Sequence, residues 1–149
     1  MFNGIIFNKG IVNKIKKSTK GVNIFVKSNL KVKNKDLGVS ICCDGVCLTM
    51  VSLKNKVMEF YLLKETMNRS KFKNISIGDK INLELPLKYG QKISGHLCQG
   101  HVDCTSKVNK IIKKGKSRIY DFTIDKKNLL YLIPKASILL NGVSLTISK

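Results

Sequence analysis

The sequence DGVCLT at residues 44–49 recurs near the end of the chain as NGVSLT at residues 141–146. Two other blocks repeat in the same order. Residues 1–6 resemble residues 97–102, and residues 12–15 resemble residues 108–111. Three ordered matches, whose offset changes by only one residue, predict a tandem duplication with a first copy over residues 1–96 and a second over residues 97–149.

By this alignment the second copy is only about half as long as the first. Half a barrel would expose strand edges and leave its core unfilled, so we expect the incomplete second copy to be unstable alone. It must pack on the first copy, pair with another chain or be disordered. A fragment or a shortened gene is the simplest explanation.

Short runs rich in β-branched and aromatic residues, separated by polar turn signals, dominate the chain. Strands are expected at residues 11–15, 22–26, 46–53, 57–63 and 81–85. Only residues 64–71 are expected to be helical. This spacing predicts an all-β fold, either a small barrel or a sandwich.

The charge of the chain does not predict nucleic-acid binding. The 28 Lys and Arg outnumber the nine Asp and Glu, giving a net charge of +19, but Arg occurs only at Arg69 and Arg118. Arg is the residue best suited to bidentate contacts with bases, and the lysines are spread along the chain instead of forming one block. AT-rich codon usage explains the excess of Lys, Asn and Ile. No apolar run is long enough to cross a bilayer and no leader is recognisable, so we expect a cytoplasmic protein without a membrane partner.

The five cysteines include no CxxC pair, and their number is odd. Cys98, His101 and Cys104 form the one string that is suggestive of zinc. On a strand, residues three apart would face opposite sides, which is poor geometry for ligands. The prediction is free thiols and no metal site.

Six motifs run in order along the whole chain: MFNGII at 1–6, DGVCLT at 44–49, KETMNRS at 64–70, GDKINLE at 78–84, GHLCQGHVD at 95–103 and NGVSLT at 141–146. Together they resemble the riboflavin synthase family. The chain departs from the family pattern at Asp44, where Asn is usual, at Asn68 in the third motif, at Lys71 directly after it, and at Ser94, where Gly is usual.

The resemblance implies two similar six-stranded antiparallel Greek-key barrels in tandem, the second incomplete here. It implies that two molecules of 6,7-dimethyl-8-ribityllumazine exchange a four-carbon unit to give riboflavin and 5-amino-6-ribitylamino-pyrimidinedione, without metal or redox cofactor. In the family each barrel binds one substrate. The active site pairs barrels of neighbouring chains in a homotrimer.

Matching the motifs residue by residue gives the candidate site. The candidate catalytic residues are Cys47, His101 and Ser40, since a thiol and an imidazole suit nucleophilic or acid–base chemistry. His96 is expected to be structural, packing the linker. The candidate substrate-binding residues are Gly4, Ile5, Ile6, Cys47, Leu48, Thr49, Tyr61, Leu62, Leu63, Lys64, Glu65, Thr66, Gly100, His101, Val102, Lys135, Ser144, Leu145 and Thr146.

Two alternatives stay open. A non-catalytic lumazine or flavin-binding protein of the same fold would keep the pocket without turnover. A basic RNA-binding barrel would fit the charge, but it needs aromatic residues for base stacking, and the chain has no Trp and no cluster of Phe or Tyr on one strand pair.

Overall fold

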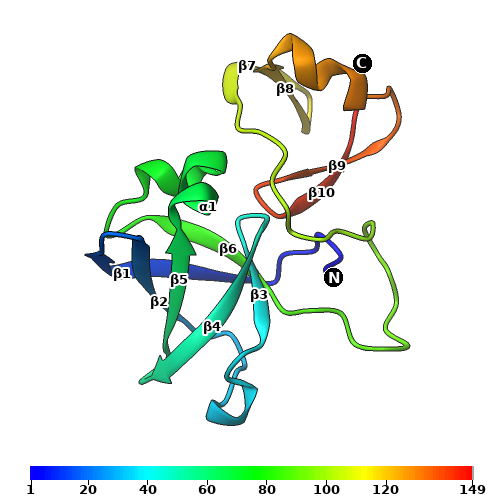
Figure 1. The fold of residues 1–149 in the computed structure, drawn as a ribbon. Helices are drawn as coiled ribbons and strands as arrows, with labels where there is room; N and C mark the ends of the chain where they lie inside the picture. The colour runs from blue at the N-terminus through cyan, green and yellow to red at the C-terminus, as the bar shows by residue number, and fades with distance from the viewer. Residues whose placement is uncertain (149) are drawn as a thin grey trace.

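The computed structural model describes residues 1–148, and Figure 1 shows a closed antiparallel barrel in its first part. Six strands close the barrel in the order β1-β2-β5-β4-β3-β6. They are β1 (Asn8–Lys17), β2 (Gly21–Ser28), β3 (Ser40–Cys43), β4 (Val46–Lys54), β5 (Val57–Leu63) and β6 (Lys80–Glu84). The all-β prediction and the five expected strands are confirmed, and the barrel is the correct choice over a sandwich. The short β3 was not expected as a separate strand.

Two tight turns set the path of the middle strands. Asp44 and Gly45 join β3 to β4 with φ angles of 46° and 89°, and Asn55 and Lys56 join β4 to β5 with φ angles of 51° and 62°. Two consecutive positive φ angles are typical of type I′ turns, whose twist suits antiparallel hairpins. Because Asp, Asn and Gly tolerate this conformation best, the sequence itself places the first turn.

The barrel interior is filled by alternate side chains of its strands. In β5, Met58, Phe60 and Leu62 are buried while the residues between them are not. Each fully buried large apolar side chain contributes roughly 1.5–3 kcal/mol to folding. Other side chains in this core come from β1, β2, β4 and β6: Val12, Ile24, Val26, Leu48, Met50, Ile81 and Leu83.

The expected helix over residues 64–71 is shorter than predicted. Helix α1 spans Lys64–Arg69 and is followed by the 3-10 helix η2 at Lys71–Asn74; η1, another 3-10 helix, lies at Asn34–Asp36. Ser70 separates α1 from η2, because its Oγ donates to Thr66 O (2.6 Å) and accepts from Phe72 N (3.3 Å). Phe72 is fully buried in the barrel core, so this segment covers one side of the barrel.

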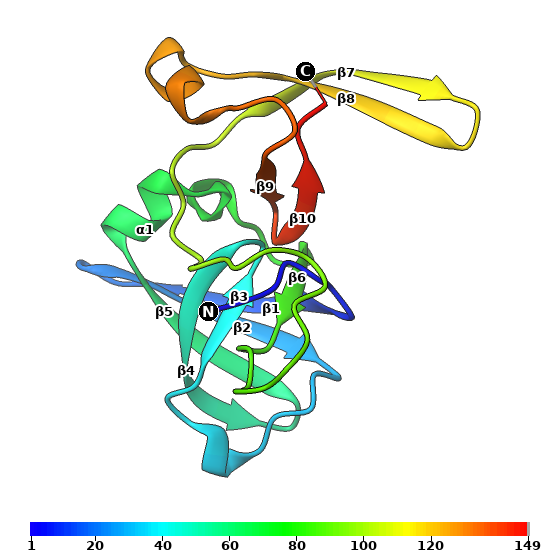
Figure 2. The same cartoon turned by 90° about the vertical axis from the view of Figure 1, so that its right-hand side faces the viewer.

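The rest of the described chain forms two separate hairpins rather than a second closed barrel. These are β7 (Lys107–Lys114) with β8 (Ser117–Thr123), and β9 (Ser137–Leu140) with β10 (Val143–Thr146); the 3-10 helix η3 (Lys126–Tyr131) lies between them. In Figures 1 and 2 the β9–β10 hairpin lies between the barrel and the β7–β8 hairpin. No helix among residues 1–148 has the length and hydropathy to span a membrane.

The hairpins repeat details of the first barrel. The register of β1 slips between Val12 and Lys14, and that of β7 slips between Val108 and Lys110, at the matching position of the sequence repeat. In the barrel, the hairpins β1–β2 and β3–β4 are joined only through β5 and β6. Residues 1–148 contain no counterparts of β5 and β6 in the second half, which explains why its two hairpins stay apart.

Candidate functional site

The beginning of each half of the chain pairs with the other half. Phe2 N donates to Cys98 O (2.8 Å), and Cys98 N donates to Phe2 O (3.0 Å). Further along, Cys47 N donates to Gly100 O (2.8 Å), and its counterpart Ser144 N donates to Gly4 O (2.8 Å). The second half therefore packs on the first, which was one of the arrangements expected from the sequence. The two sets of contacts are related by an approximate two-fold symmetry.

A hollow of about 330 Å³ opens beside the first of these crossed contacts. Three segments form its walls: the start of β4, helix α1 with Ser70, and the extended segment after Cys98. This segment has no strand between residues 99 and 106. The expectation that Cys98, His101 and Cys104 would face opposite sides of a strand was therefore wrong in its premise. The lining residues are Val46, Cys47, Glu65, Thr66, Arg69, Ser70, Gly100, His101 and Val102.

Gly100 allows the extended segment after Cys98 to lie against the start of β4. Its φ is +83°, and a Cβ at this position would lie 2.7 Å from Cys47 Cβ and 2.9 Å from Cys47 N. Both the backbone conformation and the close approach therefore require glycine. The hydrogen bond from Cys47 N to Gly100 O fixes the two walls edge to edge.

Cys47 and His101 line the same hollow, together with the hydroxyl-bearing Thr66. Cys47 is half-buried and His101 is exposed, so both are accessible to a small molecule. Glu65 and Arg69 form an ion pair at 3.0 Å on the α1 wall, with side chains 73% and 65% exposed. An exposed pair of this kind contributes little to stability, which leaves both groups available for a ligand.

The other cysteines near the crossed contacts are poor nucleophiles. Burial raises the pKa of the Cys42 thiol from 9.0 to about 12. Burial, and then the negative charge of Glu84, raise the pKa of Cys98 as well. A raised thiol pKa lowers the fraction of reactive thiolate in Cys42 and Cys98, and neither of them lines the hollow, whereas Cys47 does.

A second group of candidate residues meets at the other crossed contact. His96 Nδ1 lies 2.7 Å from Ser144 Oγ, and a Cβ on Gly4 would lie 2.7 Å from Ser144 Cβ. His96 was expected to be structural, and sequence reasoning did not link it to Ser144. The signal available was its place in the GHLCQGHVD motif. Ile5 and Ile6 follow Gly4 and are half-buried beside this contact.

The remaining candidates lie away from the hollow. Leu48 and Leu62 point into the barrel core, whereas Thr49, Tyr61 and Leu63 are exposed on the outside of β4 and β5. Ser40 opens β3 opposite Thr49 and is half-buried. Three others are exposed in the second half: Lys135, Leu145 and Thr146.

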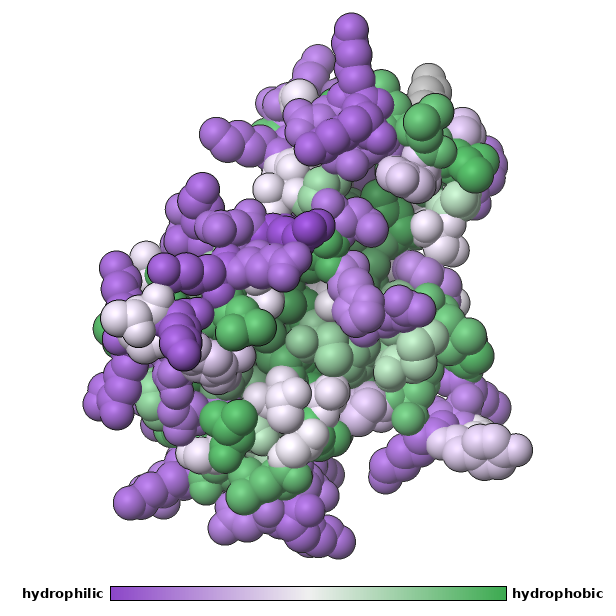
Figure 3. Space-filling view, in the orientation of Figure 1, coloured by the Kyte–Doolittle hydropathy of each residue, from purple (hydrophilic) through white to green (hydrophobic). Residues whose placement is uncertain are grey.

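Lys64 lines a different hollow of about 310 Å³ on the other side of α1. Its remaining lining residues include Lys17, Lys73 and Met67. Figure 3 shows hydrophilic side chains around most of the outline of the molecule, with hydrophobic ones exposed between them. The lysines of this hollow are three of the 26 that are spread along the whole chain, so they do not by themselves mark a site. Among residues 1–148, no three His, Cys, Asp or Glu side chains are grouped as metal ligands.

Comparisons with known proteins agree with this geometry. The lumazine binding domain family matches residues 3–86 and 99–149. The chain is 31% identical to the riboflavin synthase of Bacillus subtilis (strain 168) over 147 residues, covering 99% of this chain and 68% of the relative. It is 34% identical to the riboflavin synthase of Brucella abortus (strain 2308) over 155 residues, covering 99% of this chain and 76% of the relative.

Solved structures give the same fold. The structure of LumP complexed with 6,7-dimethyl-8-(1'-D-ribityl) lumazine aligns with a TM-score of 0.82 at 23% identity, covering all of this chain and 80% of the other. LumP complexed with riboflavin aligns with a TM-score of 0.85 at 23% identity, covering all of this chain and 81% of the other.

Proposed function

This chain belongs to the riboflavin synthase family of lumazine binding domain proteins, and from that premise we propose that it is itself a riboflavin synthase. It converts two molecules of 6,7-dimethyl-8-ribityllumazine into riboflavin and 5-amino-6-ribitylamino-pyrimidinedione. The observation that carries the proposal is the hollow of about 330 Å³ in which Cys47, Thr66 and His101 meet. Its volume is at the lower end of the usual range for small-molecule sites.

We assign a role to each group in the hollow. Backbone beside the Cys47–Gly100 contact offers polar groups to the edge of the lumazine ring, and Gly100 lets the two segments that carry this backbone approach each other. Thr66 and Glu65 offer a hydroxyl and a carboxylate to the ribityl chain. His101 moves the proton that leaves the C7 methyl group, because a neutral imidazole suits acid–base catalysis near pH 7. Cys47 is the candidate nucleophile, and Ser40, outside the hollow, stays a candidate without a contact to it.

The second substrate is proposed to bind beside Gly4 and Ser144. The symmetric hydrogen bonds Cys47 N to Gly100 O and Ser144 N to Gly4 O support this assignment, because they give both halves the same local frame. We further propose that residues 1–96 and 97–149 act as two lumazine-binding units, the second an incomplete Greek-key barrel. A neighbouring chain in a homotrimer would then bring two bound rings face to face, so that proximity drives the transfer.

A binding protein without turnover is the second candidate. The second half of the chain favours this candidate, because its two hairpins are not joined into a barrel. The proposed second site beside Gly4 and Ser144 is therefore enclosed by fewer segments than the first hollow. Such a protein would bind lumazine or a flavin at the first hollow alone.

Incubation with 6,7-dimethyl-8-ribityllumazine, followed by chromatography, separates the two candidates. Riboflavin that increases with protein concentration supports the enzyme. Saturable quenching of lumazine fluorescence without riboflavin supports the binding protein. The absence of both overturns the two proposals together.

Gly100→Ala provides a matched test of the hollow. The added methyl group would meet the Cβ and backbone of Cys47, so we expect lumazine binding to weaken at least about tenfold, or ~1.4 kcal/mol. Gly90→Ala is the control, since Gly90 also has a positive φ, of +77°, but no atom within 4 Å of the new Cβ. Equal affinities for the two variants would exclude this hollow as the site.

A further inference from the structure

Asp44 carries a buried carboxylate that the proposed mechanism does not use. Its side chain is 3% exposed, and it lies in the turn that leads into the β4 wall of the hollow. Asp44 Oδ1 accepts a hydrogen bond from Asn82 N (2.7 Å), and Asp44 N donates to Asn82 O (2.9 Å). One carboxylate oxygen is thus needed to fix the turn against β6.

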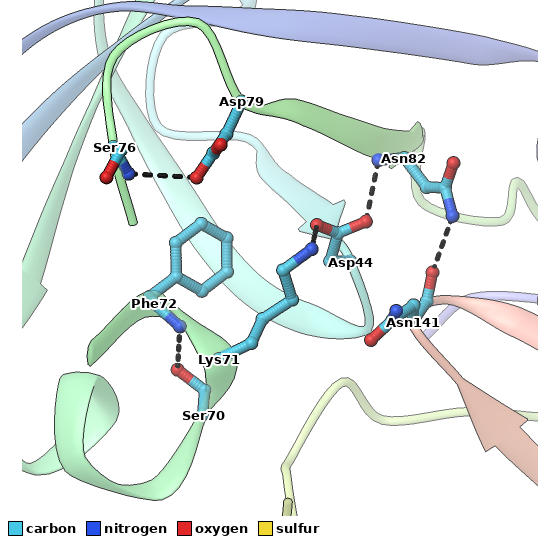
Figure 4. Close-up of polar contacts among 8 residues, drawn as sticks. All are labelled: Asp44, Ser70, Lys71, Phe72, Ser76, Asp79, Asn82 and Asn141. Atoms are coloured by element: carbon cyan, nitrogen blue, oxygen red, sulfur yellow. Dashed lines mark hydrogen bonds and ion pairs between the residues drawn. The ribbon is translucent and has the colours of Figure 1, made fainter. Parts of the chain in front are cut away.

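The other carboxylate oxygen, Oδ2, contacts the segment that follows α1. Lys71 Nζ lies 2.7 Å from Asp44 Oδ2, as Figure 4 shows. Oδ2 has no well-aligned hydrogen bond, so the ammonium group is the partner that offsets its burial. A buried carboxylate without a partner would be costly, so the pair keeps Lys71 in place although its side chain is 39% exposed.

Lys71 directly follows Ser70, the last residue of the α1 wall. Asp44 is two residues before Val46, the first residue of the β4 wall. The ion pair therefore joins the end of one wall to the start of the other. No other ion pair among residues 1–148 connects two walls of this hollow, because the Glu65–Arg69 pair lies within α1.

The equivalent turn of the second half shows what the carboxylate adds. Asn141 and Gly142 have φ angles of 47° and 81°, almost those of Asp44 and Gly45. An Asn-Gly pair therefore makes the same turn in this chain. The charge of Asp44 is not required for the turn, whereas it is required for the contact with Lys71.

We propose that the Asp44–Lys71 ion pair is a positioning element that holds the α1 wall against the β4 wall and thereby sets the affinity of the hollow for lumazine. The role assigned to the pair rests on the proposed function. The same carboxylate also reaches the second half through Asn82, whose Nδ2 donates to Asn141 O (2.9 Å) (Figure 4).

Four single variants of the whole chain test this role. Asp44→Asn keeps the turn and removes the charge, and Lys71→Met removes the ammonium and keeps most of the stem. Lys71→Arg retains the charge and should keep the lumazine affinity of the wild type. Lys73→Met is the control, since Lys73 lies in the same 3-10 helix and forms no ion pair among the described residues.

Two measurements are made on each variant. The first is the dissociation constant for 6,7-dimethyl-8-ribityllumazine from fluorescence quenching. The second is the rate at which iodoacetamide alkylates Cys47, and peptide mass spectrometry identifies the alkylated residue. This rate reports how closely the walls of the hollow meet, and it can be measured whether or not lumazine binds. Melting temperatures show that each variant is folded.

We expect Asp44→Asn and Lys71→Met to weaken lumazine binding about fivefold or more, as coupling energies of contacting residues allow, and to speed alkylation of Cys47. Lys71→Arg and Lys73→Met should stay within about twofold of the wild type. If the wild type binds lumazine, unchanged affinity in a folded Asp44→Asn variant overturns the proposal. If the wild type binds no lumazine, the proposed function fails, and the alkylation rate alone decides whether the pair positions the walls.

Discussion

At the scale of single residues, burial distinguishes two cysteines that pair across neighbouring strands. Cys42 in β3 is fully buried and lies opposite Cys47 in β4, which is half-buried and lines the hollow. The loss of hydration raises the pKa of the Cys42 thiol to about 12. The fold thus keeps one thiol of this pair inert and leaves the other accessible.

This difference predicts a specific loss of stability at alkaline pH. The unfolded chain releases the Cys42 proton above about pH 9, whereas the folded chain keeps it up to about pH 12. Stability from this group is therefore full below pH 9 and falls as the pH rises, by up to ~1.4 kcal/mol per pH unit. Urea unfolding under reducing conditions should show that Cys42→Ala loses about 1 kcal/mol less than the wild type between pH 9 and 10. Parallel pH curves for the two proteins would contradict this expectation.

At the scale of elements, the end of β6 holds the N-terminal segment. Glu84 is 9% exposed, and its Oε1 and Oε2 accept hydrogen bonds from Asn3 N (2.7 Å) and Gly4 N (3.0 Å). Asn3 Oδ1 in turn accepts from Gly95 N (2.7 Å). The carboxylate thus ties the first residues to the barrel and fixes the segment that carries Gly4 toward Ser144.

Glu84→Gln should weaken this attachment. A glutamine side chain presents an NH₂ group to one of the two backbone N–H donors, so we expect the free energy of unfolding to fall by about 2 kcal/mol. Glu59→Gln is the control, because Glu59 is a half-buried residue whose Oε1 accepts from Asn23 Nδ2 (2.6 Å) and can remain an acceptor as an amide. Its cost should stay within about 0.5 kcal/mol. Equal losses in urea unfolding would show that Glu84 has no special role.

At the scale of the whole molecule, the two halves differ in how well they are covered. Every residue of β7 and β8 is exposed, and apolar side chains such as Ile111, Tyr120 and Phe122 face solvent. In the barrel the matching hairpin is paired with β5 and β6. A two-stranded hairpin without such neighbours is only marginally stable in water.

Limited digestion with trypsin should follow this difference. We expect cuts in the exposed loop at Lys88 or Lys92 and in the β7–β8 hairpin at least about tenfold sooner than in the barrel strands, because cleavage requires local opening. Mass spectrometry over a time course identifies each cut. Cleavage after Lys27 or Lys54 at the same rate as after Lys113 would contradict a rigid barrel and a loose hairpin.

The sequence was sufficient for the local features of the fold. Alternating apolar residues and β-branched runs predicted five strands of the barrel, because these signals act between near neighbours, whereas β3 and the four strands of the second half were not predicted. The match of residues 12–15 with residues 108–111 was recognised in the sequence, but only the structure showed that both segments carry a register slip, in β1 and in β7. The motifs also placed Cys47 and His101 in one candidate site, and both line the same hollow.

Only the tertiary structure brought together partners that are far apart in the chain. Glu84 meets residues about 80 positions before it, His96 meets Ser144, and Lys71 meets Asp44. No local pattern encodes these contacts, since they exist only after the barrel closes and the two halves cross. The sequence by itself therefore determined five strands of the barrel and the family, whereas closure of the barrel decided which distant side chains form hydrogen bonds, form ion pairs and line the hollow.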